Sequence, residues 1–139
     1  MAFKDHCIDS SGQFYRDIVM YSCNHNRKHP SGSQFFFLGQ YKEIIYYGDS
    51  AYCIQPQGEK LQLHACQHRQ KGQYFKYDLD TQQIKHPEGE TACIEAGDGG
   101  QFPVMKKCDP NEVKQKWIWG TINEDNVRNW DSLNVKFDD

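Results

Sequence analysis

Apolar residues along this chain gather in short runs, separated by polar stretches rich in Gly, Pro, Asn and Asp. The segment Leu61-Gln62-Leu63-His64-Ala65-Cys66 alternates with the period of two that marks a half-buried strand. No stretch keeps apolar residues on one helical face over three turns, and only residues 111–114 suggest a single helical turn. The pattern therefore predicts short strands at residues 18–23, 34–38, 43–47, 61–66, 73–77, 83–86, 104–108, 116–119 and 126–130.

One group of markers recurs three times along the chain. Its first cysteines, at positions 7, 53 and 93, are 46 and 40 residues apart. Its second cysteines, at 23, 66 and 108, are 43 and 42 apart, and the glutamines of a Gln-x-aromatic triplet, at 34, 73 and 115, are 39 and 42 apart. Agreement of three markers on one period predicts three structural repeats.

Three units of this size must share one core, because none is large enough to bury a core of its own. Short strands with Gly- and Pro-rich turns favour an all-β fold. Three units of about four strands around a pseudo-threefold axis predict a β-trefoil. We expect one domain over residues 1–139, with repeats at about 5–48, 49–89 and 90–137.

The six cysteines form one pair per repeat, which is typical of a disulfide framework made in an oxidising compartment. Fifteen pairings are formally open, and the repeat favours Cys7–Cys23, Cys53–Cys66 and Cys93–Cys108. However, the first residues lack the apolar region of a signal peptide, and no run of about 18 apolar residues could span a bilayer. We therefore expect a domain excised from a longer protein, with the signal or anchor outside this chain.

Charge and motifs disfavour several classes of function. The net charge of −3 gives no reason to expect nucleic acid or a membrane surface as partner. There is no Gly-x-Ser-x-Gly elbow, phosphate loop or His-Glu-x-x-His motif, so no catalytic residue is expected. His25 and His29 have the spacing of zinc ligands, but they lack a companion cysteine pair, so no metal site is expected.

The three Gln-x-aromatic triplets resemble the ricin-type lectin repeat, a family of β-trefoils. Met20-Tyr21-Ser22-Cys23 and Gly32-Ser33-Gln34 are similar to the C-terminal lectin domain of polypeptide N-acetylgalactosaminyltransferases. The resemblance covers residues from about 5 to about 130. It implies a module that recognises N-acetylgalactosamine (GalNAc) on O-glycosylated peptides and directs a linked mucin-type O-glycosyltransferase.

The same resemblance implies the surroundings of the domain. Its partners would be GalNAc-bearing glycopeptides or glycoproteins and a linked catalytic domain. Manganese and UDP-GalNAc would belong to that separate domain, so this domain would hold no cofactor. Its location would be the secretory pathway and the Golgi lumen, as part of a type II membrane enzyme.

Carried over by position, the resemblance places the sugar site in the first repeat. Asp9 would be the carboxylate that accepts sugar hydroxyls, and Tyr21 the aromatic wall. Asn24 or His25 would replace the usual His, and Ser33 stands where the family has Asn. A pyranose offers an apolar face and neighbouring hydroxyls, so an aromatic ring and a fixed carboxylate suit it.

The other repeats depart from this pattern. The second has Gln55 at the carboxylate position, so we expect no sugar site there despite His68. The third has Glu95, which moves the charge one methylene outward, and Lys114 at the Asn position, so any sugar binding there would be weak or altered, and whether this repeat binds sugar is left open. The first repeat also has four extra residues between its second cysteine and its glutamine, which would overhang the first site.

Plainer interpretations remain open for these residues. Asp9 could accept backbone N–H bonds in a tight turn, and Tyr21 could serve only in packing. The three signature glutamines are expected to satisfy buried backbone groups. The rival function is a structural or protein-interaction trefoil with no functional sugar site; a protease-inhibitor trefoil is disfavoured by the Gln-x-aromatic repeats.

Overall fold

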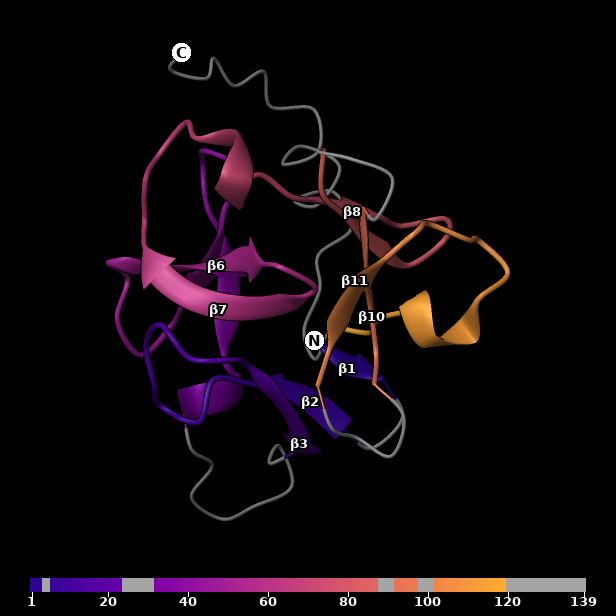
Figure 1. The fold of residues 1–139 in the computed structure, drawn as a ribbon, viewed down its shortest axis with the longest axis horizontal. Helices are drawn as coiled ribbons and strands as arrows, with labels where there is room; N and C mark the ends of the chain where they lie inside the picture. Colours follow the sequence, from indigo (N-terminus) through magenta and orange to yellow (C-terminus); the bar gives the residue numbers. More distant parts are fainter. Residues whose placement is uncertain (4–5, 24–31, 88–91, 98–101, 120–139) are drawn as a thin grey trace.

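The computed structural model describes residues 1–3, 6–23, 32–87, 92–97 and 102–119. These parts form three antiparallel sheets with the strand orders β1-β2-β3, β4-β5-β6-β7 and β11-β10-β9-β8 (Figure 1). No α-helix occurs in these ranges, and no helix found there is long and apolar enough to cross a membrane. The strands are β1 Ala2–Phe3, β2 His6–Asp9, β3 Val19–Ser22, β4 Phe36–Leu38, β5 Ile44–Tyr46, β6 Tyr52–Gln57, β7 Lys60–Ala65, β8 Lys76–Asp78, β9 Gln83–Lys85, β10 Cys93–Glu95 and β11 Val104–Lys106.

The three signature glutamines lie at the ends of short 3₁₀ turns and not at the starts of strands. These turns are η1 Gly32–Gln34, η2 Lys71–Gln73 and η4 Val113–Gln115. The strands predicted at 34–38 and 73–77 therefore begin later, at Phe36 and Lys76. The helical turn suspected at 111–114 is η4, displaced slightly along the chain.

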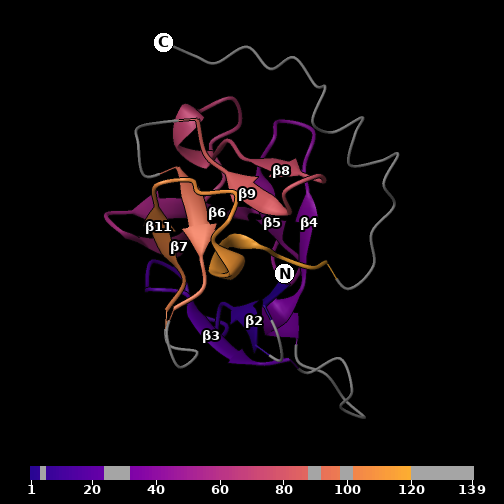
Figure 2. The same cartoon turned by 90° about the vertical axis from the view of Figure 1, so that its right-hand side faces the viewer.

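The strand predicted at 116–119 is absent. After η4 the chain makes only an isolated bridge between Ile118 and Ala2. The Ala2 N–H donates to the Ile118 carbonyl over 2.7 Å, and the Ile118 N–H donates back over 2.9 Å. This pair ties the N-terminal strand β1 to the segment after η4. In Figure 2 the N-terminus accordingly lies beside the orange part of the chain. The strand predicted at 126–130 lies outside the described residues.

One hydrophobic core joins the three repeats. The isoleucine after each first cysteine (Ile8, Ile54 and Ile94) is fully buried in a single cluster with Phe75 and Trp117. The indole N–H of Trp117 donates to the Ile94 carbonyl over 2.8 Å, so the largest core side chain is also fixed in orientation. Side chains from all three repeats therefore share one core, as expected.

The predicted disulfide pairing is confirmed. Bonds join Cys7 to Cys23, Cys53 to Cys66 and Cys93 to Cys108, across sequence separations of 16, 13 and 15 residues. Each bond links the first half of one strand to a cysteine one or two residues after the end of the next strand in the same repeat. The disulfides therefore close equivalent hairpins and hold equivalent surfaces together.

Candidate functional site

The strand register defines which residues are equivalent in the three repeats. Cys7 lies opposite Tyr21 and Asp9 opposite Val19 on β2 and β3. Residues opposite each other and residues two apart on a strand share one face of the sheet, so Asp9 and Tyr21 face the same side. The equivalent pairs are Gln55 with His64 in the second repeat and Glu95 with Lys106 in the third.

Each signature glutamine fastens two strands by its side-chain amide. In the first repeat, Gln34 Nε2 donates to Asp9 Oδ2 over 3.0 Å and to the Ser22 carbonyl over 2.9 Å. The expectation that these glutamines satisfy backbone groups is confirmed, since Gln73 and Gln115 likewise donate to carbonyls just before the second cysteine. The sequence did not reveal that the same amide also holds the side chain at the carboxylate position.

That second bond recurs in the other two repeats. Gln73 Nε2 donates to Gln55 Oε1 over 3.1 Å, and Gln115 Nε2 donates to Glu95 Oε1 over 3.2 Å. The position two residues after the first cysteine therefore has one orientation whether it carries Asp, Gln or Glu. Three copies of one framework present three different polar groups.

Asp9 is buried, with 7% of its surface exposed. Its Oδ1 accepts the Ser11 N–H over 2.7 Å, and its Oδ2 accepts the Gln34 amide. Asp9 thus makes the tight-turn bond of the plainer interpretation and is also oriented by the signature glutamine. A carboxylate offers about four acceptor positions, so two described bonds leave capacity for ligand hydroxyls.

The remaining residues predicted for the first site are only partly visible. The Ser33 carbonyl accepts from the Ser10 N–H over 2.9 Å and from the Ser10 hydroxyl over 3.1 Å, so Ser33 lies beside the residue that follows Asp9. Tyr21 exposes 57% of its surface on β3. Asn24 and His25, with most of the enlarged loop, lie outside the described residues.

The second repeat presents no carboxylate at this position. Gln55 is neutral, and the ring of Tyr15 from the first repeat packs 4.7 Å from the ring of His64. Burial lowers the pKa of His64, which favours the neutral form of its ring. His68 pairs instead with Glu43, Nδ1 to Oε2, over 3.0 Å.

In the third repeat Glu95 lines two hollows. One, of about 480 Å³, also contains Asp109, Glu112 and Gln115. The other, of about 450 Å³, is lined by Lys60, Glu95, Ala96, Gly97, Phe102, Val104, Lys106 and Lys114.

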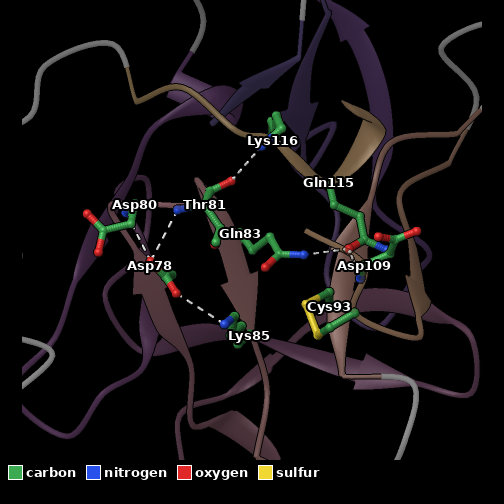
Figure 3. A network of polar contacts seen from close by, with 10 residues as sticks. Asp78, Asp80, Thr81, Gln83, Lys85, Cys93, Asp109, Gln115 and Lys116 are labelled. Atoms are coloured by element: carbon green, nitrogen blue, oxygen red, sulfur yellow. Dashed lines mark hydrogen bonds and ion pairs between the residues drawn. A yellow bond between two sulfur atoms is a disulfide. The ribbon is translucent and has the colours of Figure 1, made fainter. Parts of the chain in front are cut away.

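The amide of Gln115 is held from both ends. Its Oε1 accepts the Gln83 side-chain amide over 2.8 Å and the Asp109 N–H over 2.9 Å (Figure 3). Its Nε2 donates to Glu95 and to the Lys107 carbonyl. This network fixes the base of the third face more fully than a single bond would.

No metal centre emerges from the parts of the chain that the structure describes. Within them, no group of three or more His, Cys, Asp and Glu side chains is arranged to hold an ion.

Comparison with known proteins connects this geometry to a family. Residues 1–117 match the ricin-type β-trefoil lectin domain. N-acetylgalactosaminyltransferase 4 of Drosophila melanogaster is 27% identical over 125 residues, which are 85% of this chain and 19% of that protein. N-acetylgalactosaminyltransferase 6 of the same organism is 28% identical over 129 residues, 89% of this chain and 19% of its own length. The chain thus spans about a fifth of these relatives.

Two solved structures share the fold. The structure of GalNAc-T7 with UDP, GalNAc and Mn²⁺ aligns with a TM-score of 0.67 at 20% identity, over 81% of this chain and 20% of that one. The β-trefoil lectin of the Vibrio vulnificus hemolysin/cytolysin, with N-acetyl-D-lactosamine bound, aligns with a TM-score of 0.63 at 16% identity, over 82% and 83% of the two chains. The predicted fold and resemblance are confirmed. With three repeats, three in-repeat disulfides and a profile match over most of its length, this chain belongs to the ricin-type β-trefoil lectin domain family, whose domains are carbohydrate-binding modules.

Proposed function

We propose that this domain recognises GalNAc on O-glycosylated peptides through its first repeat. Asp9 accepts hydrogen bonds from the sugar hydroxyls, and Tyr21 packs against the apolar face of the ring. Ser33, with Asn24 and His25, completes the polar end of the site. The observation that carries the proposal is the Gln34–Asp9 bond of 3.0 Å, since it aims a buried carboxylate toward the face that Tyr21 shares.

The domain acts as the lectin part of a mucin-type O-glycosyltransferase. The similarity to N-acetylgalactosaminyltransferases of Drosophila melanogaster supports this placement. Binding of an already glycosylated peptide raises the effective concentration of further acceptor sites near a linked catalytic domain. Manganese and UDP-GalNAc belong to that catalytic domain, and the whole enzyme works in the Golgi lumen.

Titration of the domain with GalNAc, followed by backbone amide NMR shifts, tests the proposal. We expect weak affinity, about 1 mM or about −4 kcal/mol, with shifts at Ser10 and Ser33. Asp9→Ala should abolish them, and Asp9→Asn should do so while retaining the fold. Gln55→Ala removes the equivalent bond to Gln73 in the second repeat and serves as the matched control. Shifts that persist in the Asp9 variants would place the sugar elsewhere.

A second function has one observation in its favour. Asp9 is buried and already bonded through both oxygens, which suits a purely structural role in a protein-interaction trefoil. A glycan array distinguishes the two functions. Hits confined to galactose-type sugars support the lectin, and an array without such hits supports the interaction module.

A further inference from the structure

The third repeat carries lysines at two positions that shape the sugar face of the first. Lys106 lies opposite Cys93, as Tyr21 lies opposite Cys7. Lys114 accepts the Ala96 N–H at its carbonyl over 2.8 Å, as Ser33 accepts the Ser10 N–H over 2.9 Å. The aromatic and the small polar residue of the first repeat are therefore both replaced by cations.

A third cation reaches the same hollow from the second repeat. Lys60 begins β7, and its ammonium lies 4.2 Å from the centre of the Phe102 ring. The Met105 N–H donates to the Glu59 carbonyl over 2.7 Å, which anchors the β6–β7 hairpin against β11. Lys60 also pairs with Asp17 over 3.6 Å, but the two side chains are 42% and 37% exposed. Such an exposed pair is weak, so it does not prevent contact with a ligand.

The hollow therefore has a positive balance in an acidic chain. Three lysines and one glutamate are among the residues that line it, whereas the protein as a whole has a net charge of −3. The carboxylate is Glu95, whose Oε1 accepts the Gln115 amide. Lys106 is exposed on β11, so its ammonium is accessible from solvent.

We propose that this hollow binds a sugar that carries an anionic group, a carboxylate or a sulfate. Lys106 and Lys60 hold the anion, with Lys114 adding positive charge, and Glu95 accepts a hydroxyl of the same sugar. The proposal goes beyond GalNAc recognition by the first repeat, because it concerns other residues and another class of ligand.

An acidic sugar fits the hollow better than an acidic peptide does. Peptide carboxylates need only the lysines, and Glu95 would repel them. An acidic sugar supplies both an anion for the ammonium groups and hydroxyls for the carboxylate. Charge-assisted hydrogen bonds of both kinds then act on one small ligand.

The test compares matched ligands by NMR titration of the folded domain. The probes are GalNAc, a sulfate monoester of GalNAc, sialylated GalNAc and an oligoglutamate peptide. We expect the sulfated and sialylated sugars to shift the amides of Ala96, Met105 and Lys114, and to bind more tightly in about 20 mM than in about 300 mM NaCl. Lys106→Gln and Lys60→Gln should each weaken this binding about three- to tenfold at low salt.

The controls separate this proposal from general charge attraction and from the first site. Lys76→Gln makes the same change of charge at an exposed position on β8 and should leave the affinity unchanged. Asp9→Ala should leave acidic-sugar binding intact, so the two sites can fail separately. The proposal is overturned if sulfated and neutral GalNAc bind equally, if Lys76→Gln has the same effect as Lys106→Gln, or if oligoglutamate shifts the same amides with equal affinity.

Discussion

Gln34 donates its side-chain amide to Oδ2 of Asp9 over 3.0 Å, across 25 residues of sequence. The same amide nitrogen donates to the carbonyl of Ser22. One side chain therefore links the framework of the first repeat to the carboxylate proposed to face the sugar. Gln34 should therefore contribute both to stability and to ligand binding. Variants of the equivalent glutamines in the other repeats can separate the two contributions.

Gln34→Ala should lower both stability and affinity for GalNAc. The change removes two hydrogen bonds and leaves their acceptors unpaired, which costs about 2 to 3 kcal/mol. It also frees the Asp9 carboxylate to rotate. Urea unfolding and GalNAc titration measure the two effects. Gln73→Ala breaks the equivalent bonds in the second repeat and should lower stability without changing the affinity for GalNAc. If it weakens GalNAc binding as much as Gln34→Ala does, the loss of affinity reflects general destabilisation of the fold.

Tyr21→Ala should weaken GalNAc binding without loss of stability. Tyr21 is 57% exposed, so its removal uncovers little of the core. Loss of an aromatic wall costs about 1 kcal/mol, or a factor of about five to ten in the dissociation constant. Tyr47, which is 67% exposed after β5 and packs against Phe35, provides the control variant Tyr47→Ala. Equal affinities of the Tyr21 variant and the unchanged protein would assign Tyr21 to packing.

Removal of one disulfide should have a local effect on binding and a similar cost in stability wherever it is made. The double variant Cys53→Ala/Cys66→Ala opens a loop with a sequence separation of 13 residues and should cost about 3 kcal/mol. It should leave the first site intact. Cys7→Ala/Cys23→Ala frees the strands that carry Asp9 and Tyr21, so it should also abolish GalNAc binding. Thermal unfolding and sugar titration of both variants check this contrast.

The loss of folding stability at acid pH should depend in part on Asp78. Burial alone raises the pKa of this carboxyl, but hydrogen bonds from Lys85 and from the Thr81 and Asp80 amides outweigh it, so the pKa is lowered overall (Figure 3). A carboxyl with a lowered pKa adds stability above its unfolded pKa of about 3.9, and this stability is lost as the pH falls through the folded pKa.

Asp78→Asn should therefore be less stable than the unchanged protein at neutral pH, and the difference should shrink below about pH 4. Urea unfolding between neutral and acid pH measures the difference. Asp80→Asn, at an exposed position on the same turn, is the control. A gap between Asp78→Asn and the unchanged protein that stays constant with pH would contradict the assignment.

Repetition explains why so much of the fold followed from the sequence. Three independent markers at one spacing define the repeats, and the first and second cysteine of each repeat occupy equivalent places. Asp9, Gln55 and Glu95 could be aligned by position alone. The difference between Tyr21 and Lys106 is visible in the same alignment, once strand register shows that each lies on the same face as the residue two after the first cysteine.

Contacts between repeats could not be predicted in this way. The packing of Tyr15 against His64 and the approach of Lys60 to Phe102 depend on how neighbouring hairpins meet. The bridge between Ala2 and Ile118 joins residues far apart in sequence, and no local sequence pattern predicts it. The 3₁₀ turns that end at Gln34 and Gln73 were missed, because the aromatic residues that follow each glutamine resemble the start of a strand.

The shared amide bond to Asp9, Gln55 and Glu95 has a consequence for how such a domain diversifies. Because the glutamine amide donates equally to the side-chain oxygen of Asp, Gln or Glu at that position, this residue can be exchanged without a change in the backbone that supports it. Ligand preference is then an independent property of each repeat. With the two sites proposed above, a single folded unit would bind a neutral sugar at one face and an acidic sugar at another, and so respond to the combination of modifications on one glycoprotein.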